Sequence, residues 1–146
     1  MGDVLAVVEQ REGKVRGISN EVVSAATELA NGLGGSVHAL LIGGEGVAAD
    51  ASGLGKYGAE KVRVAEMGPL AGYHPEGYTQ VVVEAVRAGQ YAAVVVGATS
   101  QGKDLAPRVA AVLDVPLASD ITEMGVDDGV VVVVRPVFAG DGATGI

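Results

Sequence analysis

The sequence contains no cysteine, no tryptophan and few other aromatic residues, and each shortage excludes a class of function. Without cysteine there is no disulfide framework, no zinc–thiolate site and no cysteine nucleophile. Four tyrosines and one phenylalanine are too few for a stacking platform for single-stranded nucleic acid, and a net charge of −8 repels a phosphate backbone. The two histidines, His38 and His74, have no partners at metal-ligand spacing, so we expect no metal site.

Long hydrophobic runs are also missing. No apolar stretch approaches the roughly 18 residues that a membrane helix needs, and residues 1–3 lack the basic region of a signal peptide. A hydrophobic content of 49% with 19% charged residues excludes disorder. We therefore expect a soluble, acidic domain over 1–140 that does not insert into a membrane, with residues 141–146 as a frayed tail or the start of a linker. The expected compartment is the cytoplasm, or the mitochondrial matrix in a eukaryote.

Valine-rich runs alternate along the chain with alanine-rich stretches of helical periodicity. Short runs of consecutive apolar, β-branched residues are typical of buried strands. Such strands are predicted at 4–8, 37–42, 62–65, 92–98 and 130–134, with a short one at 122–124. Helices are predicted from Ser19 to Leu33, weakly over 48–54, from Pro75 and over 104–113. This order predicts an α/β fold: an open, mostly parallel, Rossmann-like sheet with helices on both faces.

Local signals predict where these helices begin. Ser19 is a candidate N-cap, and 10–17 is predicted to be a polar loop. A helix that begins at Asp104 places Pro107 in its first turn, where proline is tolerated, and puts Val112 on its buried side. Glycines at 53, 55 and 58 predict that the second helix is short or frayed.

The segment 97–104 is the strongest candidate for binding chemistry. It follows a strand and opens a helix, and the carboxyl ends of parallel strands are where open α/β sheets bind ligands. Backbone N–H groups at a helix start, with nearby hydroxyls, suit a phosphate-type anion. The candidate residues are Gly97, Thr99, Ser100, Gly102 and Lys103. The spacing is not that of a P-loop, and the alternative is a tight turn in which the glycines only permit the backbone path.

Other segments carry weaker signals. The turn after the first strand is polar and lacks the glycine pattern of a dinucleotide site, and the glycine-rich turn at 43–46 carries an acidic residue that opposes phosphate. Arg135 and Asp120 are candidate interface residues, with a solvated or salt-bridged arginine at the strand end and structural capping as their respective alternatives. No serine–histidine–aspartate set, paired carboxylates or nucleophile elbow is present, so no catalytic residue is assigned and we expect no enzyme activity of this chain alone.

Several of these segments resemble the amino-terminal part of the electron transfer flavoprotein α subunit. They include 4–9 with Gly13-Lys14, 33–40, and 57–62. The most specific stretch is GATSQGKDLAPRVAA at 97–111, which continues into DVPLASDI at 114–121 and RPVFAG at 135–140. The resemblance covers nearly the whole chain.

The resemblance implies an adenine-nucleotide α-hydrolase-like fold and a part in an electron carrier. FAD is then expected in a parent complex, held by a carboxyl-terminal domain that this sequence lacks, with no cofactor in this chain itself. The expected partners are the β subunit and, through the complex, acyl-CoA-type or other dehydrogenases and a quinone oxidoreductase. The alternative is an autonomous adenine-nucleotide-binding module resembling universal stress proteins, although the glycine spacing at 97–102 differs from theirs.

Overall fold

A six-stranded sheet forms the centre of the molecule in the computed structural model, which describes residues 2–118 and 130–138. The strand order is β5-β4-β1-β6-β8-β7, and all pairings between these strands are parallel, which confirms the predicted sheet. The strands are β1 (Gly2–Val7), β4 (Gly34–Gly43), β5 (Ala59–Glu66), β6 (Tyr91–Gly97), β7 (Leu117–Ala118) and β8 (Val131–Arg135).

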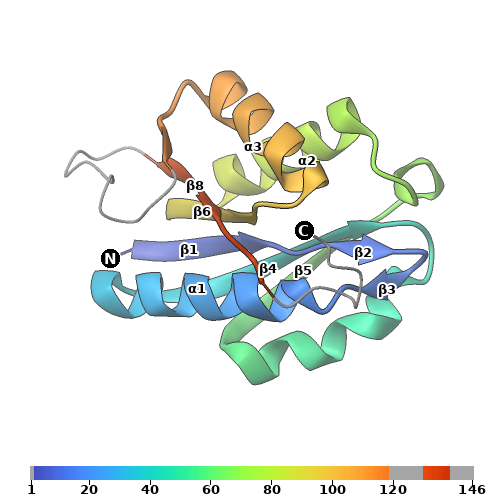
Figure 1. Cartoon of the computed structure of the whole chain (residues 1–146), viewed down its shortest axis with the longest axis horizontal. Helices are drawn as coiled ribbons and strands as arrows, with labels where there is room; N and C mark the ends of the chain where they lie inside the picture. The colour runs from blue at the N-terminus through green and yellow to red at the C-terminus, as the bar shows by residue number, and fades with distance from the viewer. Residues whose placement is uncertain (1, 119–129, 139–146) are drawn as a thin grey trace.

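Helices cover both faces of the sheet, as predicted (Figure 1). One face carries α1 and the 3-10 segment η1, and the opposite face carries α2 and α3 (Figure 1). The bounds are α1 (Ile18–Leu33), η1 (Val47–Tyr57), α2 (Pro75–Ala88) and α3 (Ser100–Leu113), with a short 3-10 turn η2 (Gly68–Leu70) before α2. The fold is therefore an open Rossmann-like α/β sheet. No helix in the described ranges is long and apolar enough to cross a membrane.

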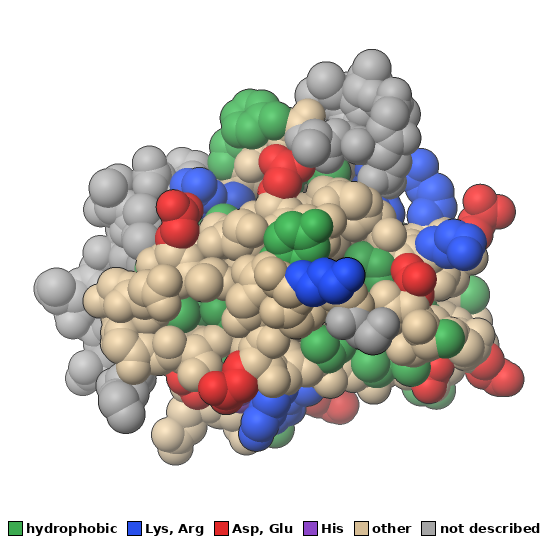
Figure 2. All heavy atoms as spheres, turned by 90° about the horizontal axis from the view of Figure 1, so that it is seen from below, with side chains coloured by type: hydrophobic (Ala, Val, Ile, Leu, Met, Phe, Trp, Pro, Cys, Tyr) green, Lys and Arg blue, Asp and Glu red, His purple; other side chains and the backbone are tan. Residues whose placement is uncertain are grey.

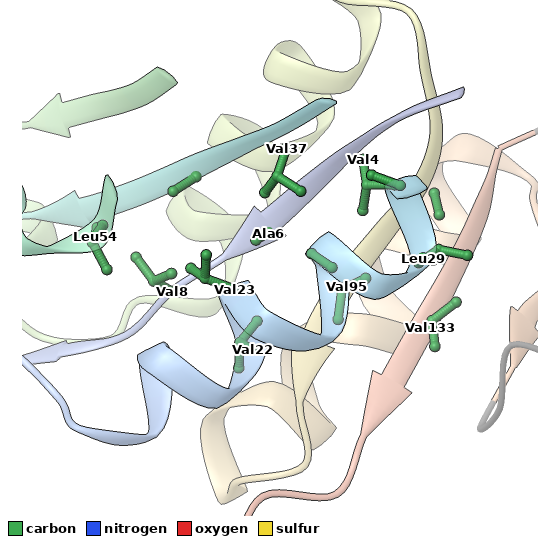
Figure 3. Packing of buried hydrophobic residues seen from close by; sticks show 14 of the residues in the cluster. Val4, Ala6, Val8, Val22, Val23, Leu29, Val37, Leu54, Val95 and Val133 are labelled. Carbon is green, nitrogen blue, oxygen red and sulfur yellow. The ribbon is translucent and has the colours of Figure 1, made fainter. Parts of the chain in front are cut away.

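The central strand β1 is buried on both faces because its side chains alternate between two cores. Val4 and Ala6 point to the α1 side, where they join a cluster with Val22 (Figure 3). Leu5, which is also fully buried, points to the other side and packs in a cluster with Leu105 of α3. A continuous apolar run such as 4–8 is what this two-sided burial requires.

A small antiparallel hairpin replaces the polar loop predicted over 10–17. It pairs β2 (Gln10–Arg11) with β3 (Lys14–Val15). The two turn residues, Glu12 and Gly13, both have positive φ angles, of 53° and 84°. A two-residue turn with positive φ at both positions matches the twist of a hairpin, and glycine adopts it without strain.

The N-terminus of α1 also differs from its prediction. The helix begins at Ile18 with Gly17 at the N-cap, so Ser19 lies inside the first turn and the capping prediction is wrong. Ser19 is fully buried, and its hydroxyl bonds to the backbone of Glu9 instead of to its own helix. A serine hydroxyl can bond to the backbone groups of a neighbouring loop as readily as to those of a helix start, and the sequence alone does not distinguish the two.

Helix α3 begins at Ser100, four residues before the predicted start at Asp104. Thr99 is its N-cap and accepts a hydrogen bond from the backbone of Gly102. Pro107 consequently lies in the interior of the helix and not in its first turn, which corrects the prediction. The prediction of Val112 on the buried side is also wrong: its side chain is 53% exposed, whereas Leu105 and Val109 are buried.

The 3-10 segment η1 and the strand β7 also differ from the prediction. The weak helix predicted over 48–54 is a 3-10 segment over Val47–Tyr57, longer than expected and of tighter geometry. Strand β7 has no counterpart in the prediction, since two residues carry no periodicity. The strand predicted over 122–124 and the tail 141–146 lie outside the described residues, so those expectations remain predictions.

Candidate functional site

The sheet has a topological switch point between β1 and β6. From β1 the chain moves through α1 to β4 and η1 to β5, then returns through α2 to β6 on the other side of β1. Val7 and Val96 are register partners near the carboxyl ends of these neighbouring strands. The segments that follow β1 and β6 therefore meet at the position where open α/β sheets bind ligands.

The β6–α3 turn brings four of the five predicted loop residues together. The Thr99 hydroxyl accepts a 3.0 Å hydrogen bond from the Gly102 N–H, and the Lys103 N–H bonds to the Thr99 carbonyl at 2.8 Å. A Cβ on Gly102 would lie 1.8 Å from the carbonyl oxygen of Gly97, so only glycine allows this approach. Thr99 is buried, whereas the Ser100 and Lys103 side chains are exposed. The glycines thus have a structural role, and anion binding by this loop stays a prediction.

Glu9 is the carboxylate that faces this turn. It follows β1, is 3% exposed, and accepts a hydrogen bond from the Thr99 hydroxyl on Oε2. Its other oxygen, Oε1, lies 2.8 Å from Nη1 of Arg16, whose side chain is 10% exposed. A buried carboxylate is tolerated when it is paired and hydrogen-bonded, and both oxygens here have partners. The polar side chains of the switch point therefore bind one another.

The backbone of Glu9 is fixed as well. Its N–H donates to Oγ of Ser19 at 2.9 Å, and the Ser19 hydroxyl donates back to the Glu9 carbonyl at 3.1 Å. The Arg16 N–H donates to the same carbonyl at 2.8 Å. Three segments are thus joined at one point: the end of β1, the start of α1 and the start of α3. We call Glu9, Arg16, Ser19 and Thr99 the switch-point clamp.

Gln10 extends this polar contact toward the α2 side. Its Nε2 donates to the Ala71 carbonyl at 3.0 Å and to Oη of Tyr78 at 3.2 Å. The Tyr78 hydroxyl in turn donates to the Leu70 carbonyl at 2.6 Å. Burial raises the pKa of Tyr78 above its usual value of 10, the bond from Gln10 lowers it, and the nearby Glu9 carboxylate raises it. Tyr78 therefore keeps its proton and acts as a donor.

Arg135 ends β8 beside the candidate loop, as the register partner of Gly97. Its carbonyl accepts a 2.8 Å hydrogen bond from the Ala98 N–H, while its Nε is buried without a hydrogen-bond partner in the described part of the chain. A hollow of about 250 Å³ adjoins it, lined also by Ala25, Glu28, Leu29, Val95 and Val133. The interface role of Arg135 stays a prediction, and Asp120 lies outside the described residues.

The histidines have structural contacts. His74 is the N-cap of α2, where its Nδ1 accepts a 2.8 Å hydrogen bond from the Gly77 N–H. His38 of β4 makes a 2.7 Å contact through Nδ1 with Oη of Tyr91. Within residues 2–118 and 130–138 there is no group of three histidine or acidic side chains that could hold a metal ion.

Sequence reasoning does not find the clamp. Glu9 and Arg16 stand out in the sequence only as members of polar segments, and Ser19 has the pattern of a cap. The available signal is a carboxylate directly after a fully apolar strand, at the edge where ligands bind. Its partner Thr99 lies 90 residues away, and no local pattern connects the two.

Comparison with known proteins places this geometry in a family. Residues 4–146 match the model of the electron transfer flavoprotein domain. The chain is 36% identical over 137 residues to the electron transfer flavoprotein subunit alpha of Bacillus subtilis, and 37% identical over 140 residues to that of Megasphaera elsdenii; each match covers 94% of this chain and 41% of the relative. It is also 36% identical to the acryloyl-CoA reductase electron transfer subunit beta of Anaerotignum propionicum, over 86% of this chain and 34% of that protein.

The chain thus spans about two fifths of the length of the α subunits that it matches. The family model, in contrast, covers almost every residue from the first strand onward. With the predicted fold confirmed and the match extending over both the central strands and the β6–α3 turn, the chain belongs to the electron transfer flavoprotein family.

Proposed function

We propose that this chain is the amino-terminal scaffold and interface domain of an electron-transferring flavoprotein, which carries electrons from dehydrogenases to an acceptor. The family match and the names of the relatives support the electron-transfer role. In this proposal the chain performs no chemistry itself. It holds a partner subunit and a flavin domain in position, and position matters because electron transfer slows steeply as cofactors separate.

One observation carries the scaffold assignment. At the switch point, where a nucleotide-binding sheet would hold its ligand, Glu9, Thr99 and Arg16 bind one another in a buried network. Such a network stiffens the centre of the sheet and satisfies the groups that a ligand would otherwise contact. FAD is accordingly proposed to be held elsewhere in the parent complex, as the resemblance implies.

The partners are part of the same proposal. They are the electron transfer flavoprotein β subunit and, through the complex, acyl-CoA-type or other dehydrogenases and a quinone oxidoreductase. Figure 2 shows that on the α1 and η1 face basic, acidic and hydrophobic side chains are interspersed and no one sign of charge gathers. A mixed surface of this kind suits a protein partner better than a nucleic acid. A cytoplasmic location is retained as a proposal, and the relatives reported above are bacterial.

The test is flavin retention. The purified chain is mixed with excess FAD and desalted, and the flavin absorbance is compared with that of a full-length α–β complex of the family treated in the same way. We expect the complex to keep stoichiometric flavin and the chain to keep none, while the chain still binds an isolated β subunit. Stoichiometric flavin on the chain alone, or no binding to the β subunit, overturns the scaffold assignment.

The alternative function, an autonomous adenine-nucleotide module, rests on the helix start at Thr99 and Gly102. Calorimetry with ATP and AMP distinguishes it from the scaffold. Micromolar binding to the wild-type chain favours the nucleotide module, and no heat up to millimolar concentration favours the scaffold.

A further inference from the structure

The buried carboxylate of Glu9 needs a physical explanation, because an acidic side chain at the centre of a sheet is costly to desolvate. Glu9 is 3% exposed and lies at the carboxyl end of the central strand. It is not a surface residue that happens to be covered, since both its backbone and its side chain are fixed by named partners.

The partners of that carboxylate are the groups that an external anion would use. Arg16 supplies a guanidinium N–H at 2.8 Å, and Thr99 supplies a hydroxyl proton. Because the Thr99 hydroxyl also accepts from the Gly102 N–H, the negative charge of Glu9 is linked to the N-terminus of α3, where an anion is stabilised. The hydroxyl has one proton, and Glu9 already receives it.

We propose that the Glu9 carboxylate is the resident anion of this sheet: it occupies the position that the phosphate or carboxylate of a small ligand takes at a switch point. It thereby closes the position to external anions and holds the end of β1, the start of α1 and the start of α3 together. This inference concerns only side chains of the described chain, and it stands whether or not the chain serves an electron carrier.

The consequence is that removing the side chain creates a vacancy of defined chemistry. Glu9→Ala removes a CH2 and a carboxylate, which are the atoms that acetate supplies. Arg16 and Thr99 remain beside the vacancy. Acetate is therefore the matched probe, with inorganic phosphate and AMP as tests of larger anions.

The first experiment follows the melting midpoint of the full 146-residue chain in acetate and in chloride at equal ionic strength. We expect the melting midpoint of E9A to lie below that of wild type. Acetate should raise this midpoint in a saturable manner, and chloride should not. Wild type should respond equally to the two salts and should bind neither phosphate nor AMP at millimolar concentration. E45A, which alters an exposed glutamate in the turn after β4, is the control and should behave as wild type.

A double variant identifies where acetate binds. E9A combined with Arg16→Met should lose most of the acetate response, because the guanidinium partner is gone. The proposal is overturned if acetate and chloride act alike on folded E9A, if the double variant responds as E9A does, or if wild type binds phosphate or AMP.

Should E9A fail to fold, a second variant tests the clamp. Thr99→Val keeps the size of the side chain and removes the hydroxyl that joins Glu9 to α3. We expect its NMR amide shifts to change at Arg16 and Ser19 as well as at Gly102, while Thr99→Ser leaves them near wild type. His74→Ala, which removes the N-cap of α2, is the matched control and should act only on the first turn of α2. T99V changes confined to α3 overturn the proposal.

Discussion

The Tyr73 hydroxyl donates a 2.6 Å hydrogen bond to Oδ2 of Asp104, and this contact joins the loop before α2 to the first half of α3. The same carboxylate oxygen accepts a 3.0 Å bond from Nε of Arg108, one turn further along α3. Burial raises the pKa of Tyr73 above its usual value of 10, and the Asp104 carboxylate raises it further through the hydrogen bond. The hydrogen bond from Tyr73, followed by that from Arg108, lowers the pKa of Asp104.

These shifts predict a loss of stability in alkaline solution. Because Tyr73 has a higher pKa in the folded chain than in the unfolded chain, its contribution is fully present below about pH 10 and is lost as the pH rises toward the folded pKa. Burial also raises the pKa of Tyr78 and of Tyr91, so both residues change the stability in the same direction as Tyr73. Melting midpoints measured from neutral pH upward should fall above about pH 10, less steeply in Tyr73→Phe than in wild type. Equal slopes for the two proteins would contradict the assignment to Tyr73.

The ion pair of the clamp predicts strong coupling between two substitutions. Glu9→Ala removes one carboxylate partner of the Arg16 guanidinium, and Arg16→Met leaves the buried Glu9 carboxylate without that guanidinium. Arg16→Met should lower the free energy of unfolding by about 3 kcal/mol, since it leaves a buried charge without its ion pair, and Glu9→Ala should lower it as well. The double variant should cost clearly less than the sum of the two. Denaturant unfolding of the four proteins measures this, and additive losses would show that the side chains act independently.

The close approach in the β6–α3 turn predicts opposite effects of alanine at two glycines. Gly102→Ala places a Cβ 1.8 Å from the Gly97 carbonyl oxygen and should destabilise the chain by about 3 kcal/mol, because backbone must move. Gly32 lies inside α1, and a Cβ added there would meet nothing within 4 Å. Gly32→Ala should therefore stabilise by up to about 1 kcal/mol through helix propensity. Chemical denaturation distinguishes the two, and similar effects of both substitutions would refute the argument.

The different burial of two valines on α3 predicts which of them stabilises the chain. Val109 is fully buried, whereas Val112, on the same helix, is 53% exposed. Val109→Ala should cost about 2 kcal/mol through lost burial and the cavity left behind. Val112→Ala should stay within about 0.5 kcal/mol of wild type. A loss at Val112→Ala as large as that at Val109→Ala would contradict the exposed position of Val112.

The strands could be predicted from the sequence because each is a short apolar run that both faces of the sheet bury. Val4 to Val8 and Val94 to Val96 show this directly, with exposures of 2% or less. The parallel arrangement follows from the helical stretches between them. Periodicity is a sufficient signal wherever hydrophobic burial decides the local structure.

Helix starts are harder to predict, because they depend on which of several polar residues caps the helix. Ser19 has the right chemistry for a cap but bonds to Glu9, and Thr99 is the cap that begins α3 before Asp104. Pro107 is misleading for the same reason, since a proline that is safe in a first turn also occurs inside this helix. At Ser19 a contact with another segment outweighs the local preference, whereas at α3 one local cap, Thr99, precedes another candidate, Asp104.

The candidate site could be predicted only in part. The turn at 97–103 is recognisable because glycine and hydroxyl residues follow a strand there, and the structure brings Gly97, Thr99 and Gly102 together. The carboxylate that faces the turn is not recognisable from the sequence, because Glu9 lies 90 residues away from Thr99. One sequence contains no record of that pairing.

The position of β1 has a consequence for the newly made chain. Strand β1 is an inner strand of the sheet and leaves the ribosome before both of its neighbours: one of its edges pairs with β4, while the other waits for β6, with Val7 opposite Val96. At typical elongation rates the ribosome needs about 5 to 20 seconds to make the residues between them. Throughout that interval an apolar edge with free backbone groups is open to pairing with another chain. A chaperone that covers this edge during synthesis should therefore raise the yield of folded protein more than one added after release.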